Sequence, residues 1–114
     1  MELGLVVRDQ EGWSVLAVSG EIDIATAPSL RERLHGLLAE HKRQIVVDLD
    51  DVGFLDSTAL GVRVGVLKRA RSEAGEVRIV CTQPRVRKVF EITRLDSAFD
   101  LFDSVDEAVR GAQE

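Results

Sequence analysis

The chain opens with two runs of apolar and β-branched residues separated by a short polar segment. The runs cover Leu3 to Arg8 and Trp13 to Ser19, and Asp9-Gln10-Glu11-Gly12 lies between them. A polar spacer that ends in glycine between two such runs is typical of a four-residue hairpin connection. We therefore expect two antiparallel strands at the start of the fold.

An amphipathic helix is predicted next. Thr26 is a candidate N-cap, Pro28 follows in the first turn, and leucines recur at helical spacing at positions 30, 34, 37 and 38. The basic residues at 41–43 suit the negative end of the helix dipole.

Ile45 to Leu49 shows no alternation of apolar and polar positions, as expected of a strand covered on both faces, so we place it at the sheet centre. From Thr58 to Ala74 strand-like and helix-like periodicities conflict. Seventeen residues is long for a strand, and Gly75 is a suitable helix end, so a helix is predicted there.

The remaining elements are a strand at Val77–Cys81, a short helix from Pro84 and an edge strand at Phe99–Phe102. Ser104 and Glu107 have the spacing of a capping box ahead of a last helix. Strands that alternate with helices after a hairpin predict an α/β fold. We expect a mixed central sheet of about five strands with about four helices packed against it.

Composition limits the class of protein. At 114 residues, 45% of them hydrophobic, the chain should form one domain over residues 1–114 that buries its own core. The net charge of −5 opposes binding to nucleic acid. No basic leader or long apolar segment is seen, and Cys81 is the one cysteine, so we expect a cytoplasmic protein without a membrane partner.

The residues that usually carry catalysis form no recognisable set. His35 and His41 lack acidic neighbours at metal-ligand spacing, and no histidine lies near Cys81 in sequence to activate its thiol. The glycines do not form a phosphate-binding loop. We therefore expect no enzyme, catalytic residue, metal or cofactor; a small nucleotide hydrolase, in particular, would need such a loop.

One motif stands out, where the buried strand leads through an acidic turn into Asp56-Ser57-Thr58 and the predicted helix. In one interpretation Asp56 or Ser57 only caps the helix, which contributes about 1 kcal/mol. In the other, the Ser57 hydroxyl is exposed at a helix N-terminus and accepts a phosphate as a switch. Spacing alone favours the cap.

The sequence resembles the STAS domain family, and within it the bacterial anti-sigma factor antagonists. Residues 49–61, read as L-D-D-V-G-F-L-D-S-T-A-L-G, look like the family's strand-turn-helix motif. Gly20-Glu21-Ile22-Asp23, with Ala27, looks like the segment before its first helix. The similarity extends over nearly the whole chain and implies a single STAS-like domain.

The resemblance also implies a function. The unphosphorylated protein would capture an anti-sigma factor, itself a serine kinase with an ATP-binding fold, and so free a sigma factor. Phosphorylation of Ser57 would end the capture, and a PP2C-type phosphatase would restore it. The implied partner-binding residues are Asp23, Asp56, Ser57, Thr58 and Gly61. Ala59 stands where the family often has glycine, which bears on partner specificity.

The charge of the switch can be bounded. A phosphate carries about −1.5 to −2 charges at neutral pH, and on Ser57 it would lie beside Asp56 and close to Asp50, Asp51 and Asp23. Like charge at an interface predicts a loss of affinity of about a hundredfold or more. The alternative is a STAS interaction module of a stressosome-like scaffold or a lipid-transport system, without switching at Ser57.

Overall fold

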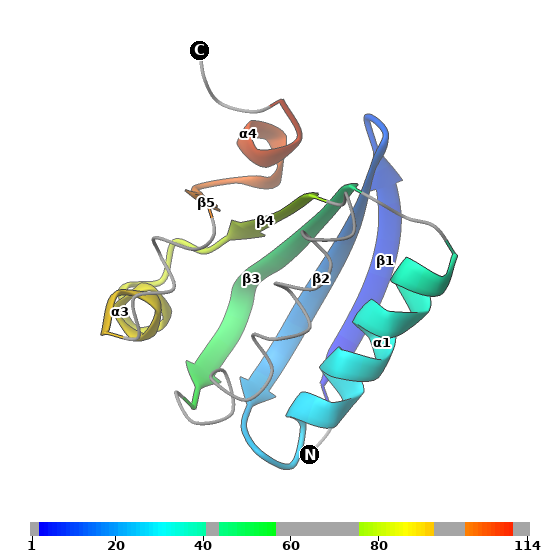
Figure 1. The fold of residues 1–114 in the computed structure, drawn as a ribbon. Helices are drawn as coiled ribbons and strands as arrows, with labels where there is room; N and C mark the ends of the chain where they lie inside the picture. Colours follow the sequence, from blue (N-terminus) through cyan, green and yellow to red (C-terminus); the bar gives the residue numbers. More distant parts are fainter. Residues whose placement is uncertain (1–2, 41–43, 57–75, 93–99, 111–114) are drawn as a thin grey trace.

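The computed structural model describes residues 3–40, 44–56, 76–92 and 100–110, which form a five-stranded sheet and three helices (Figure 1). In chain order the elements are β1 (Gly4–Gln10), β2 (Trp13–Ile22), α1 (Ala27–Ala39), β3 (Gln44–Leu55), β4 (Glu76–Val80), α3 (Pro84–Ile92), β5 (Asp100–Phe102) and α4 (Val105–Arg110). The helix expected at 58–74 and the basic residues at 41–43 lie outside the described ranges.

The sheet has the order β1-β2-β3-β4-β5, with β1 antiparallel to β2 and each later pair parallel. This confirms the predicted mixed sheet of five strands, with β3 at its centre and β5 at an edge. The connection between β1 and β2 is shorter than expected, because Gln10 already pairs with Trp13. Only Glu11 and Gly12 remain, both at positive φ (50° and 86°), the backbone of a two-residue type I′ turn.

β3 is longer than the sequence indicated. The prediction of an acidic turn after Leu49 is wrong, because Asp50 and Asp51 belong to a strand that continues to Leu55. Its pairing with β2 contains two register shifts, between Ala17 and Ser19 and between Gly20 and Glu21. β3 therefore contributes two more residues than β2 over the paired stretch, and these bulges let polar residues and a glycine occupy a continuous strand.

Helices cover the two faces of the sheet unequally. The larger core cluster joins one face to α1 and α3 through, among others, Leu34, Leu37, Val86 and Phe90. The smaller cluster joins the other face to α4 and consists of Trp13, Val15, Val46, Val80, Ala108 and Val109. In β3, Ile45 and Val47 lie in the first cluster and Val46 in the second, which explains its unbroken apolar sequence.

Arg78 of β4 fastens α4 to the sheet. Its guanidinium carbon lies 4.4 Å from the ring centroid of Trp13 and 5.6 Å from that of Phe102. The same group donates a hydrogen bond to the carbonyl oxygen of Ala108 at 2.5 Å and forms an ion pair with Glu76 at 3.0 Å. The Arg78 side chain thus contacts both the rings of Trp13 and Phe102 and the backbone of α4.

The predicted cap of the last helix is present. The backbone N–H of Glu107 donates to the hydroxyl oxygen of Ser104 at 3.1 Å, so one free amide of α4 is satisfied by a side chain.

Candidate functional site

Two of the predicted site residues meet where β2 and β3 end. Ile22 pairs with Leu55 in the parallel ladder, and the backbone N–H of Asp56 donates to the carbonyl oxygen of Ile22 at 2.9 Å. Asp23 and Asp56 therefore follow adjacent strand ends, a common place for binding sites in α/β folds. We call residues 21–24 and 54–56 the carboxyl edge (Figure 1). Ser57, Thr58 and Gly61 lie outside the described residues.

Asp23 organises the turn that leads into α1. Its carboxylate accepts hydrogen bonds from the backbone N–H groups of Ala25 and Thr26, each at 2.9 Å, and its carbonyl oxygen accepts from Ala27 at 2.8 Å. The hydrogen bond from the Thr26 backbone is the main reason that the pKa of Asp23 is lowered. The side chain is thus held as a carboxylate in a fixed turn.

The expectation that Thr26 caps α1 is right for its position and wrong for its hydrogen bonds. Thr26 occupies the N-cap position, but its side chain makes no capping hydrogen bond. Its buried hydroxyl instead donates to the carbonyl oxygen of Glu21 at 2.7 Å and accepts from the backbone N–H of Asp23 at 2.9 Å. It therefore ties the end of β2 to the start of α1. Asp23 accepts from the backbone N–H groups of Ala25 and Thr26 through its carboxylate and from that of Ala27, the first residue of α1, through its carbonyl oxygen. Pro28 lies in the first turn, as predicted.

The carboxyl edge carries acidic and apolar groups together. Residues 19–30 and 44–56 contain no lysine or arginine, while Glu21, Asp23 and Asp56 are acidic. Ile24 is 65% exposed and Phe54 is 42% exposed. The sequence analysis did not single out these two side chains. Two features of the sequence could have indicated their exposure. Ile24 lies in the short segment before the predicted helix, and Phe54 directly precedes Leu55, so the two side chains of that pair would point to opposite faces of a strand.

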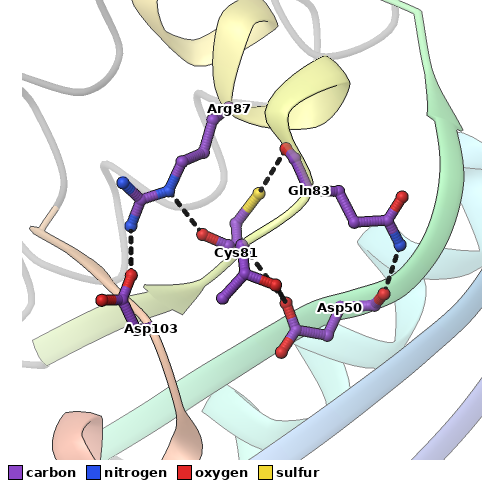
Figure 2. A network of polar contacts seen from close by, with 6 residues as sticks. Asp50, Cys81, Gln83, Arg87 and Asp103 are labelled. Carbon is purple, nitrogen blue, oxygen red and sulfur yellow. Dashed lines mark hydrogen bonds and ion pairs between the residues drawn. The ribbon is translucent and has the colours of Figure 1, made fainter.

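Asp50 belongs to a different part of the molecule, a network that fixes the start of α3 (Figure 2). Its carboxylate accepts from the backbone N–H and the hydroxyl of Thr82, both at 2.9 Å, and its carbonyl oxygen accepts from the Gln83 side chain. Six residues of extended strand separate it from Asp56, roughly 20 Å at the usual rise per residue. Asp50 therefore lies well away from Asp56; its distance from Ser57 falls outside the described residues.

The same network continues to the edge strand. Arg87 donates from Nε to the carbonyl oxygen of Cys81 at 2.6 Å and pairs with Asp103 at 2.9 Å (Figure 2). The Cys81 thiol is buried, and burial raises its pKa to about 11. A thiol in that state is a poor nucleophile, so the network reads as structural.

Asp48 lies on β3 two residues before Asp50, farther from the carboxyl edge. Burial raises its pKa, with the nearby charges of Asp50 and Asp51 acting in the same direction, while a hydrogen bond from the backbone N–H of Asp50 at 3.0 Å lowers it.

Among the described residues, no group of three or more histidine, cysteine or acidic side chains has the arrangement of a metal site. No helix in these ranges has the length and apolar character needed to cross a bilayer.

Comparison with known proteins supplies the family. The STAS domain model matches residues 5–108. The anti-sigma-B factor antagonist of Bacillus subtilis is 35% identical over 101 residues, which cover 89% of this chain and 92% of that protein. The crystal structure of an anti-sigma factor antagonist from Mycobacterium paratuberculosis matches with a TM-score of 0.86 and 32% identity, over 98% of this chain and 95% of that one.

A more distant match is the phosphorylated form of SpoIIAA from Bacillus, with a TM-score of 0.70 over 96% of this chain and 100% of that one. At 19% identity it shows a common fold. The family match and the two relatives above 30% identity show the family of this chain. The chain belongs to the STAS domain family, among the anti-sigma factor antagonists.

Proposed function

We propose that this protein is a partner switch in the cytoplasm that captures an anti-sigma factor and thereby releases a sigma factor. The partner is a serine kinase with an ATP-binding fold, and it docks on the carboxyl edge. Phosphorylation of Ser57 by that kinase ends the capture, and a PP2C-type phosphatase restores it. In this mechanism the protein is a substrate and a binding partner and catalyses nothing itself.

The observation that carries the proposal is the hydrogen bond between Asp56 and Ile22. It fastens the residue before Ser57 to the strand that leads into Asp23. The peptide bond from Asp56 to Ser57 therefore starts at the same edge as the Asp23 turn. The names of the relatives, antagonists of anti-sigma factors, support the same class of partner.

Electrostatics gives the direction of the switch. A phosphate on Ser57 adds about −1.5 to −2 charges directly after Asp56, at an edge that already holds the Asp23 carboxylate and no lysine or arginine in its two strand segments. A partner surface that accepts the neutral hydroxyl then meets an excess of negative charge. Like charges at an interface cost several kcal/mol, and each ~1.4 kcal/mol is tenfold, so affinity should fall at least a hundredfold.

The test is reconstitution with purified anti-sigma factor kinases of the source genome. With ATP, mass spectrometry should find one added phosphate, located on Ser57. Without ATP, Ser57→Ala should bind the kinase with nearly unchanged affinity, whereas Ser57→Asp should bind at least a hundredfold more weakly.

Ser104→Asp is the matched control, because it adds the same charge at a position where aspartate is also a good helix cap. Ser104 lies beyond the end of β5, whose last residue is level with Val80 and Asp48, well back from the carboxyl edge. Its affinity should stay within about threefold. Equal binding by Ser57→Ala and Ser57→Asp, or phosphorylation at another residue, would refute the proposed switch.

A further inference from the structure

Two exposed apolar side chains flank the acidic residues of the carboxyl edge. Among the described residues, the large hydrophobic side chains that stand exposed are Val6, Ile24, Phe54 and Ile92. Ile24 directly follows Asp23, and Phe54 lies two residues before Asp56. Both therefore belong to the segments that end at this edge, whereas Val6 lies in β1 and Ile92 ends α3.

The local structure keeps Ile24 in solvent. The residue lies between Asp23 and Ala25, and the Ala25 backbone N–H donates to the Asp23 carboxylate at 2.9 Å. The turn is closed further by the bonds from Thr26 and Ala27 to the same aspartate. Because both ends of this segment are fixed, the backbone cannot rotate to bury the isoleucine. A partner that binds Ile24 would therefore lose little conformational entropy in ordering the turn.

The register of the sheet keeps Phe54 exposed. Ile22 pairs with Leu55 and both are buried, so the preceding pair, Glu21 and Phe54, points to the opposite face. A shift of one residue would be needed to turn Phe54 inward, and it would turn Leu55 out. The ladder thus places an aromatic ring beside a glutamate on an open part of the sheet.

The exposed side chains of the carboxyl edge indicate the chemistry of the partner surface that would fit it. An exposed isoleucine and an exposed phenylalanine favour an apolar pocket, and aromatic side chains are frequent anchors at the centre of protein interfaces. The acidic groups at the same edge, Glu21, Asp23 and Asp56, favour arginine or lysine around that pocket.

We propose that Ile24 and Phe54 are the apolar anchors of the docking surface, and that the anti-sigma factor receives them in an apolar pocket edged by basic side chains. This inference rests on the proposed function, since it names the part of the same edge that holds the partner. Ile24 and Phe54 determine how long the complex lasts, and the carboxylates determine how fast it forms.

The experiment measures association and dissociation rates of the unphosphorylated chain with the purified anti-sigma factor kinase. Ile24→Ala and Phe54→Ala should each weaken binding about tenfold or more, almost wholly through faster dissociation, at both low and high salt. Asp23→Asn should instead slow association, with an effect that diminishes as salt rises. Phe54→Leu should recover part of the lost affinity, because it restores apolar surface.

Ile92→Ala and Val6→Ala are the controls, because they remove comparable exposed apolar groups elsewhere. Both should bind within twofold of the unchanged protein. Thermal unfolding should show all four alanine variants folded, since each side chain is exposed.

The outcomes separate this inference from the proposed function. If the unchanged protein binds the kinase and is phosphorylated on Ser57, but Ile24→Ala and Phe54→Ala bind within twofold of it, the anchors are wrong and the switch stands. If the unchanged protein binds none of the genome's anti-sigma factor kinases, both proposals fall.

Discussion

Replacing Arg78 with alanine is expected to loosen α4 and to lower the free energy of unfolding by about 3 kcal/mol. The side chain is 15% exposed, and it joins β4 to the ring of Trp13 and to the backbone of Ala108. Without it, the Ala108 carbonyl at the end of a six-residue helix loses its charged donor. A helix this short depends on its tertiary contacts rather than on intrinsic helix stability.

The magnitude follows from the separate contacts. The cation–π contact with Trp13, largely shielded from water, contributes about 1–2 kcal/mol. A hydrogen bond from a charged donor contributes about 1.5–3 kcal/mol net. The ion pair with Glu76, whose side chain is 49% exposed, contributes at most about 1 kcal/mol. A loss of about 3 kcal/mol corresponds to a fall in Tm of about 12 °C for a domain of this size.

Urea unfolding followed by tryptophan fluorescence is a suitable assay, because Trp13 is the one tryptophan of the chain and lies under Arg78. The unfolding midpoint should fall by about 1.5 M. Arg78→Lys keeps the charge but loses the planar group that stacks on the ring, so it should lose about half as much stability. Glu76→Ala, which removes only the ion pair, should lose less than about 1 kcal/mol.

A change below about 0.5 kcal/mol for Arg78→Ala would refute this reasoning. So would an equal loss for Glu76→Ala, because the stability would then come from the surface ion pair rather than from the stacked and hydrogen-bonded guanidinium.

Two further predictions concern titratable groups. Because burial raises the pKa of Asp48, its charge destabilises the folded state above that pKa and has no effect well below 3.8, where folded and unfolded chains are both protonated. Asp48→Asn should therefore raise Tm at pH 7, with a gain that shrinks as the pH falls toward 4; lower stability of this variant at pH 7 would contradict the argument. Because the pKa of Cys81 is about 11, iodoacetamide at pH 8 should alkylate the native protein at least about a hundredfold more slowly than the urea-unfolded protein, as followed by mass spectrometry, and similar rates would show that the thiol is accessible.

Strong periodic patterns in the sequence predicted most of the described fold. The apolar run at Ile45–Leu49 identified the central strand because both faces of β3 are covered there. Its full length was missed because Asp50, Asp51 and Gly53 are unfavourable in strands. Bulges and side-chain hydrogen bonds accommodate them, and both depend on the neighbouring strands rather than on the local sequence.

The candidate site was predicted in part for a similar reason. Asp23 and Asp56 were implicated by their motifs, and the parallel pairing of β2 and β3 brings their segments together. The roles of Asp23 and Thr26 in the turn were not separable by sequence, because either side chain can satisfy a free helix amide. The exposure of Ile24 and Phe54 depends on the register of the finished sheet.

The bulged pairing of β2 with β3 also limits which genetic changes the protein tolerates. A β-carbon added at Gly53 would meet no atom of the described residues within 4 Å, so substitution of Gly53 should have little effect on folding. Deletion of the same residue would either exchange the inward and outward positions near Leu55 or draw Asp56 back from Ile22 by about 3.3 Å. Between positions 48 and 56, evolution is freer to replace residues than to add or remove them.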